Sequence, residues 1–354
     1  MLSGGGTGGH IFPAVAIARE LERVFPGCEI LFIGANNRME MEKIPQEGYR
    51  IVGLNVAGLK RSISPANLKV AWQFLGSWWK ARKILKDFKP DCVIGTGGYA
   101  SLAVLYAASG MGFKTLIWEG NGYAGLTNKI LAKRVNTICT GFPGMEQFFP
   151  PSKTIYTGNP VREEMLHLPD RTTALSFFGL NAEQPVIFIT GGSLGARTLN
   201  MAVQKAMDKI ATENIQWIWQ TGKNFTPAEP LPTHVKAMPF LREMNMGYAA
   251  ADVVISRAGA LSIAEIAVAG KPSILVPSPN VTEDHQTQNA LKLTANHAAL
   301  MVRDTEAMDR LIPTAIDLAG DAAKRQAIQQ ALKPLAKPNA STEIVLQIKK
   351  LTEK

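Results

Sequence analysis

The first ten residues combine glycines with a threonine and a histidine, a composition suited to phosphate binding and proton transfer. Gly4, Gly6 and Gly9 have the G-x-G-x-x-G spacing, in which backbone N–H groups approach a phosphate at a helix N-terminus. His10 follows directly. An imidazole with an ordinary pKa of about 6.5 accepts protons near neutral pH. We therefore expect His10 to act as a general base or to position a substrate.

A second glycine-rich stretch, GGSLGARTLN (191–200), follows the apolar run PVIFIT. Ser193 has the position of a helix N-cap, and its hydroxyl could instead contact a phosphate. Further on, Ser262 and Glu265 have the S-x-x-E spacing of a capping box, which would start a helix. The alternative is functional, because the two oxygens of Glu265 could accept both hydroxyls of a ribose.

The polar stretch NVTEDHQTQNA (280–290) follows another apolar run, SILVPSP. Gln286 and Asn289 are three residues apart, so they share a helical face, and neutral amides suit sugar hydroxyls. A solvated loop is the alternative interpretation.

A dinucleotide site would need an acidic residue at the end of the strand that follows the first helix. The segment EILFIGANN (29–37) ends in asparagines instead, which disfavours a dehydrogenase. The strand before the first loop would be residues 1–3 alone. Because three residues are short for a central parallel strand, we expect residues to be missing or misassigned at the N-terminus.

The composition is that of a globular protein of two domains, with 354 residues, 46% hydrophobic and 19% charged. We expect no signal peptide and no membrane-spanning helix. Cys28, Cys92 and Cys139 are far apart and lie in or beside apolar segments, which predicts buried thiols. The five histidines show no zinc spacing, and the net charge of +9 indicates an anionic partner.

Short apolar strands alternate with amphipathic helices along the chain, which predicts parallel α/β sheets covered on both faces. The segment TGNPVREEM (157–165) has the composition of a connection, and the strand, glycine loop and helix pattern restarts after it. We therefore expect an N-terminal domain over 1–160, a C-terminal domain over 161–336, and a helix over 337–354 that packs back on the N-terminal domain.

Residues 68–89 combine tryptophans with lysines at helical spacing, as interfacial helices do. The predicted contacts with an anionic membrane surface are Trp72, Leu75, Trp79, Lys80 and Lys83. A helix with its aromatic residues packed on the domain core is the alternative. A lipid partner would account for part of the positive charge, so we expect no nucleic-acid partner.

Seven motifs, taken in order, resemble the MurG family of N-acetylglucosaminyltransferases. They are GGGTGGHIFP, GGYAS, EGNGYAGLTNK, TGNPVR, TGGSLGARTLN, ISRAGALSIAEI and EDHQTQNA. The resemblance implies a GT-B fold, two Rossmann-like domains with parallel sheets that face each other across a cleft. It implies transfer of N-acetylglucosamine (GlcNAc) from UDP-GlcNAc to the C4 hydroxyl of the N-acetylmuramic acid (MurNAc) of lipid I, with inversion and with no metal or cofactor. It also implies a peripheral protein on the cytoplasmic face of the inner membrane.

The same resemblance assigns residues to the two substrates. For the donor they are Arg162, Gly192, Ser193, Phe240, Leu241, Ala260, Leu261, Ser262, Glu265, Gln286 and Asn289. The backbone at Phe240 and Leu241 would bind uracil, and Glu265 the ribose. For the acceptor they are Thr7, Gly8, Gly9, His10 and Asn121, with His10 as the first candidate for the catalytic base and Glu119 as the second.

One motif departs from the family pattern. Where the family commonly has H-E-Q-N, residues 118–121 read WEGN, so an acceptor-side contact is absent. Two other functions remain open: a GT-B transferase with another lipid or small-molecule acceptor, and a membrane scaffold whose donor site has decayed. Intact Glu265, Gln286 and Asn289 argue against the scaffold.

Overall fold

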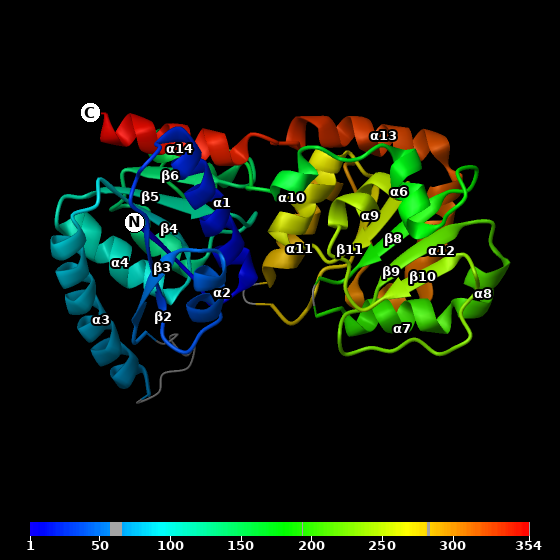
Figure 1. The fold of residues 1–354 in the computed structure, drawn as a ribbon, viewed down its shortest axis with the longest axis horizontal. Helices are drawn as coiled ribbons and strands as arrows, with labels where there is room; N and C mark the ends of the chain where they lie inside the picture. The colour runs from blue at the N-terminus through cyan, green and yellow to red at the C-terminus, as the bar shows by residue number, and fades with distance from the viewer. Residues whose placement is uncertain (57–65, 193, 282–283, 354) are drawn as a thin grey trace. The chain divides into compact units, whose positions relative to one another are not determined.

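The computed structural model describes residues 1–56, 66–192, 194–281 and 284–353, with residues 66–71 described as backbone only. It divides the chain into two compact units (Figure 1). The first unit comprises Met1–Val161 together with Asn339–Lys354, and the second comprises Arg162–Pro338. Both are α/β units with parallel sheets, as the alternating pattern predicts.

The first unit is built on a parallel sheet whose described strands have the order β3-β2-β1-β4-β5-β6-β7. Its strands are β1 (Leu2–Gly4), β2 (Leu31–Ala35), β3 (Arg50–Leu54), β4 (Cys92–Gly97), β5 (Lys114–Glu119), β6 (Thr137–Thr140) and β7 (Thr154–Tyr156). Its helices are α1 (Gly8–Val24), α2 (Glu40–Gln46), α3 (Ala66–Phe88), α4 (Tyr99–Gly110), α5 (Leu126–Leu131) and α14 (Ala340–Thr352).

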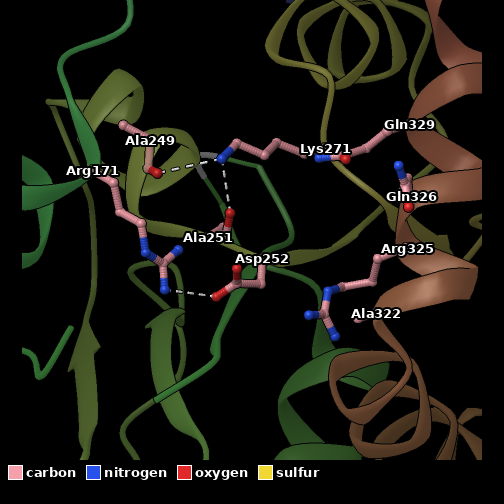
Figure 2. Close-up of a pocket in the computed structure, with 9 residues that line it drawn as sticks. All are labelled: Arg171, Ala249, Ala251, Asp252, Lys271, Ala322, Arg325, Gln326 and Gln329. Atoms are coloured by element: carbon pink, nitrogen blue, oxygen red, sulfur yellow. Dashed lines mark hydrogen bonds and ion pairs between the residues drawn. The ribbon is translucent and has the colours of Figure 1, made fainter. Parts of the chain in front are cut away.

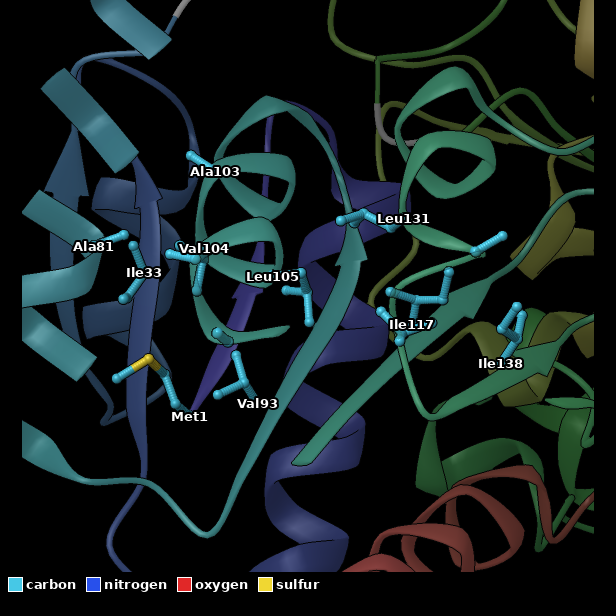
Figure 3. Packing of buried hydrophobic residues seen from close by; sticks show 14 of the residues in the cluster. Met1, Ile33, Ala81, Val93, Ala103, Val104, Leu105, Ile117, Leu131 and Ile138 are labelled. Carbon is cyan, nitrogen blue, oxygen red and sulfur yellow. The ribbon is translucent and has the colours of Figure 1, made fainter. Parts of the chain in front are cut away.

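Two helical layers enclose this sheet. Helix α1 contacts α2 and α14, whereas α4 contacts α3 and α5 on the opposite face, as right-handed crossovers require. Figure 3 shows the core between the sheet and α3 and α4, where Ile33, Val93 and Val104 interdigitate with Leu105 and Ile117. Alanines such as Ala103 and Ala107 in α4 let this helix approach the strands closely.

The first strand corrects one expectation. We expected residues 1–3 to be too short for a central strand, but β1 lies between β2 and β4 and pairs with both. Neighbours on both sides compensate for its length: the Met1 amino group donates to the Cys92 carbonyl at 2.9 Å, and Leu2 is fully buried. A three-residue strand is therefore sufficient where both edges are paired.

The second unit repeats the architecture, with the order β10-β9-β8-β11-β12-β13 among its described strands. These are β8 (Val186–Thr190), β9 (Gln216–Gln220), β10 (Val235–Met238), β11 (Val253–Ser256), β12 (Ser273–Leu275) and β13 (Leu300–Met301). The helices are α6 (Arg171–Phe178), α7 (Arg197–Lys205), α8 (Met207–Thr212), α9 (Met244–Ala250), α10 (Ala260–Ala269), α11 (His285–Thr294), α12 (Ala307–Gly320) and α13 (Ala322–Leu332).

Each sheet reverses its strand order at one point, between β1 and β4 in the first unit and between β8 and β11 in the second. In open α/β sheets, ligands bind beyond the carboxyl ends of the strands at such a point. The glycine loop at residues 5–9 follows β1, and the loop at residues 191–195 follows β8. The two loops singled out by sequence thus lie at the two sites that the topology favours.

Candidate active site

His10 lies at the start of α1, where the glycine loop fixes its ring. Its Nδ1 is 2.9 Å from the Gly5 carbonyl oxygen. Because a carbonyl only accepts hydrogen bonds, Nδ1 carries a hydrogen, and in the neutral ring the lone pair is on Nε2. The ring packs on Gly97, where a Cβ would be 2.8 Å from Nε2, and Gly97 has φ +109°. The geometry therefore fixes the orientation of the ring and directs Nε2, not Nδ1, to a substrate proton.

A buried carboxylate that the sequence analysis missed holds the same loop. Glu40 is fully buried and accepts hydrogen bonds from the backbone N–H groups of Gly6, at 2.8 Å, and Ala35, at 2.9 Å. It lies on α2, in a segment with no motif, so only the fold brings it to the loop. Thr7 is the N-cap residue of α1. Thr7 and Gly9 are exposed, and they lie in the glycine loop that Glu40 holds through the N–H of Gly6.

Glu119, the second candidate for the base, lies at the end of β5 and is buried. Its Oε1 accepts from the backbone N–H of Asn121 at 3.0 Å and from the Asn121 amide at 3.4 Å. Its Oε2 accepts from the Gly125 N–H and the Asn128 amide, both at 2.9 Å. These bonds use the acceptor positions of both oxygens, so the carboxylate organises the loop that carries Asn121.

The structure gives a physical reason for the departure at residues 118–121. Trp118 is buried, and its ring lies against Gly120, where a Cβ would be 2.4 Å from Cη2. The indole Nε1 donates to the Gly158 carbonyl at 3.4 Å. The tryptophan thus fills space that a side chain at position 120 would need, and the two residues form a matched pair.

In the second unit, the glycine loop and the Phe240–Leu241 segment are joined by Gln220, which the sequence analysis also missed. Its amide nitrogen donates to the Gly192 carbonyl at 2.9 Å, and its oxygen accepts from the Leu241 N–H at 3.1 Å. Ser193 lies outside the described residues, and the N-cap of α7 is Ala196. Of the two residues expected to bind uracil through their backbone, Leu241 already has its N–H engaged, and Phe240 is exposed.

The predicted capping box at Ser262 and Glu265 is wrong. Helix α10 begins earlier, with Gly259 as its N-cap, so Ser262 already lies inside the first turn with Ala260 and Leu261. The Glu265 carboxylate faces another partner. Arg162 donates to it from Nε at 2.8 Å and from Nη2 at 3.0 Å, a bidentate ion pair. The Glu265 carboxylate is therefore engaged by Arg162 and not by the N-terminus of its own helix.

The two amide residues of α11 have different surroundings. Asn289 is fully buried, and its amide donates to the Ala258 carbonyl at 3.1 Å, in the loop between β11 and α10. Gln286 is half-buried, and its oxygen accepts from the Ser278 N–H at 2.8 Å. Both therefore fix loops at the carboxyl edge of the sheet.

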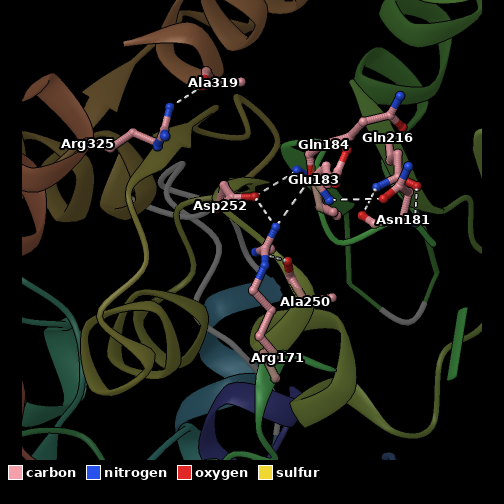
Figure 4. A network of polar contacts seen from close by, with 12 residues as sticks. Arg171, Asn181, Glu183, Gln184, Gln216, Ala250, Asp252, Ala319 and Arg325 are labelled. Atoms are coloured by element: carbon pink, nitrogen blue, oxygen red, sulfur yellow. Dashed lines mark hydrogen bonds and ion pairs between the residues drawn. The ribbon is translucent and has the colours of Figure 1, made fainter. Parts of the chain in front are cut away.

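A cavity of about 450 Å³ in the second unit lies at the opposite, amino edge of the sheet (Figure 2). Its cations are bound to the protein itself. Lys271 donates to the Ala249 and Ala251 carbonyls at the end of α9, and Arg325 to carbonyls at the end of α12. Arg171 pairs with Asp252 at 2.9 Å (Figure 4). Cations at helix C-termini are stabilising, so a structural role accounts for this cluster.

Helix α3 presents an apolar and basic face. Trp72 and Trp79 are 69% and 64% exposed, and Leu75, Lys80 and Lys83 are exposed on the same helix. Phe74 and Trp78 instead pack on the core. In the described part of the chain, no helix combines the length and apolar character needed to cross a bilayer. Nor do the described residues bring together three or more His, Cys, Asp or Glu side chains in a metal-binding arrangement.

Comparison with known proteins identifies the family. The glycosyltransferase family 28 N-terminal domain matches residues 1–140, and the family 28 C-terminal domain matches residues 186–344. The chain belongs to glycosyltransferase family 28. Family 28 membership extends over both units, and each matched domain contains one of the two glycine loops.

Relatives of this family 28 chain match it from end to end. A Porphyromonas gingivalis (strain W83) protein is 47% identical over 361 residues, covering 100% of this chain and 95% of its own. A Flavobacterium psychrophilum protein is 47% identical over 357 residues, covering 100% and 97%. Both are named UDP-N-acetylglucosamine--N-acetylmuramyl-(pentapeptide) pyrophosphoryl-undecaprenol N-acetylglucosamine transferase.

Solved structures support the fold assignment. The crystal structure of Acinetobacter baumannii MurG matches with a TM-score of 0.82 and 28% identity, covering 99% of each chain. The calicheamicin glycosyltransferase CalG4 matches with a TM-score of 0.69 at 15% identity, a likeness of fold alone. The predicted GT-B fold and the predicted resemblance to the MurG family are confirmed.

Proposed function

We propose that this chain is a UDP-GlcNAc-dependent N-acetylglucosaminyltransferase that converts lipid I to lipid II. Full-length identity of 47% to curated transferases with this activity carries the assignment. UDP-GlcNAc is the donor and lipid I the acceptor. The site geometry supports it, because both switch points carry glycine loops and because Glu265 on α10 presents its carboxylate to Arg162 instead of capping its own helix.

In the proposed reaction, the C4 hydroxyl of the lipid I MurNAc attacks the anomeric carbon of the donor. The bond between this carbon and the β-phosphate oxygen breaks, and UDP leaves with the electron pair. The configuration inverts because attack and departure take place on opposite faces. The hydroxyl proton goes to Nε2 of His10, whose lone pair is kept available by the Nδ1 contact with Gly5.

The charge that develops on UDP needs stabilisation, and we assign it to backbone N–H groups of the loop after β8. Gly192 and Gly195 have φ values of +84° and +76° in this loop. Residues with a side chain rarely adopt such positive φ values, so glycine permits this loop conformation. Arg162 adds a cation, and the residues at the start of α10 line the same edge. We propose that no metal takes part.

We propose that α3 contacts an anionic membrane surface through Trp72, Leu75, Trp79, Lys80 and Lys83. Exposed tryptophans beside lysines favour the headgroup region, where the ring is buried and the cation faces phosphate. This would place the acceptor side of the protein near its lipid substrate, peripherally at the cytoplasmic face of the inner membrane.

The function is tested by transfer of radiolabelled GlcNAc from UDP-GlcNAc to a short-chain lipid I analogue, in the presence of EDTA. We expect transfer that is unaffected by EDTA and abolished when Glu265 is replaced by Ala. A parallel reaction with diacylglycerol as the acceptor tests the alternative function, which is transfer to another lipid. Transfer to diacylglycerol without transfer to the lipid I analogue would replace our assignment with that alternative.

A further inference from the structure

Tyr248 on α9 carries a buried hydroxyl that has no role in the proposed reaction. It is fully buried, and its OH donates to Oε2 of Glu265 at 3.3 Å. Its ring packs edge-on against Phe188 of β8, with ring centroids 5.6 Å apart and an interplanar angle of 87°. Strand β8 is the strand that leads into the glycine loop. The ring is therefore held in place by the core of the second unit.

The carboxylate of Glu265 has few acceptor positions left. Of about four positions on its two oxygens, Arg162 takes one on Oε1 and one on Oε2, and Tyr248 takes the other on Oε2. Among the described residues, only Oε1 therefore keeps an open position. Two vicinal ribose hydroxyls need one position on each oxygen, so a partner must leave Oε2 when the donor binds.

Arg162 and Tyr248 differ in their ability to leave. The Arg162 side chain is 42% exposed and also contacts Glu164 at 3.2 Å, so it can turn toward an incoming diphosphate. Tyr248 is fully buried, and its ring packs against Phe188, so it cannot turn toward solvent as Arg162 can. Burial, with the neighbouring Glu265, holds the pKa of Tyr248 well above its usual value, so the hydroxyl remains a donor.

We propose that Tyr248 is a positioning residue for the donor: its hydroxyl holds the Glu265 carboxylate in the orientation that accepts the ribose hydroxyls after Arg162 has moved away. This inference rests on the proposed function and deepens its donor site. Tyr248 itself does not contact the substrate in this scheme. It fixes the angle of the carboxylate, and the loss of its hydroxyl would let the carboxylate rotate.

The test removes one hydroxyl from the protein and one from the ligand. Inhibition constants are measured for UDP and for 2′-deoxy-UDP with wild type and with Tyr248→Phe. Each ratio of the two constants is independent of the fraction of folded enzyme. In wild type we expect UDP to bind about 10-fold or more tightly than 2′-deoxy-UDP, as for a hydrogen bond to a charged group. In Tyr248→Phe we expect this preference to fall to about 3-fold or less.

A matched control is Tyr49→Phe, because Tyr49 in the first unit also donates to a carboxylate, Glu22, at 2.8 Å. We expect its UDP preference to equal that of wild type. We also expect Tyr248→Phe to raise the KM for UDP-GlcNAc with little change in kcat, since the hydrogen bond serves donor binding.

A third variant, Glu265→Gln, separates the two ways in which the proposal can fail. If Glu265→Gln loses the preference for UDP and Tyr248→Phe keeps it, the role of Tyr248 is refuted and the donor assignment stands. If Glu265→Gln keeps the preference, then Glu265 does not bind the 2′-hydroxyl and the inference fails with that assignment. Loss of the preference in both variants supports the inference.

Discussion

The indole of Trp118 and the backbone of Gly120 occupy adjoining space, so closely that a Cβ on Gly120 would lie 2.4 Å from Cη2 and 2.8 Å from Cζ2. Side-chain carbons do not approach an aromatic ring to this extent. The loop from Gly120 to Gly125 is also anchored by the Glu119 carboxylate, through Asn121 and Gly125. Residue 120 therefore cannot carry a side chain unless Trp118 moves.

We predict that Gly120→Ala displaces the Asn121 loop and raises the KM for the lipid I analogue, while the KM for UDP-GlcNAc stays unchanged. Overpacking of this kind costs about 1–3 kcal/mol of stability. Steady-state kinetics with each substrate varied and a thermal melt check both parts. The double variant Trp118→Leu/Gly120→Ala serves as control, because it restores the space. If the two substitutions prove additive, the pair is not coupled.

We predict that His10→Gln lowers kcat by about 10²–10⁴-fold, the usual contribution of a general base. The sign of the pH dependence follows from the role. A general base must be unprotonated to accept the proton, so wild-type kcat should fall toward acidic pH, and the variant should lack this acidic limb. Glutamine can still donate to the Gly5 carbonyl, which preserves the positioning contact. An acidic limb retained in the variant would assign His10 to positioning alone.

We predict that Trp72→Ala/Trp79→Ala weakens binding to vesicles containing anionic lipid without lowering the melting temperature, because both side chains are largely exposed. Vesicle sedimentation at low and high salt measures the binding. Trp78→Ala is the contrasting variant: Trp78 packs on the core and stacks with Arg82, so its loss should lower the melting temperature. Equal vesicle binding by wild type and the double variant would remove α3 from the proposed membrane contact.

We predict that the thiols of Cys92 and Cys139 lower stability at alkaline pH. Burial raises the pKa of Cys92 to about 11 and that of Cys139 to about 12, against 9.0 for an unperturbed thiol. Between pH 9 and the raised pKa of each buried thiol, the thiol has lost its proton in the unfolded chain and keeps it in the folded protein. The unfolded state then binds fewer protons, so stability falls as pH rises from 9 toward 11.

Urea unfolding at several pH values from 8 to 11 checks this prediction, with Cys139→Ala as the comparison. The variant should lose less stability over the range than wild type does. A thiol reagent at pH 8 should modify native Cys28, which is half-buried, ahead of Cys92 and Cys139. Parallel pH profiles for wild type and variant would contradict the expected linkage.

Local sequence was sufficient to predict the α/β class and the glycine loops, because strand runs, loop glycines and amphipathic helices are encoded over a few residues. It was insufficient for Gln220, Glu40 and Tyr248. Tyr248 lies 17 residues before its partner Glu265, and Glu40 lies 34 residues after Gly6. Such contacts depend on the order of strands in the sheet, which no spacing rule reveals. The capping box failed for a local reason instead, since the helix already starts at Gly259, before Ser262.

The return of α14 to the first unit has a consequence for biosynthesis. Thr342 of α14 donates to Glu20 of α1 at 2.6 Å across 322 residues of sequence, and α14 buries Ile344, Val345 and Ile348. On a ribosome, the whole second unit emerges between these two partners. At a synthesis rate of about 5–20 residues per second, α1 lacks its contacts with α14 for tens of seconds. The first unit is therefore the last to be completed, although most of it is made first.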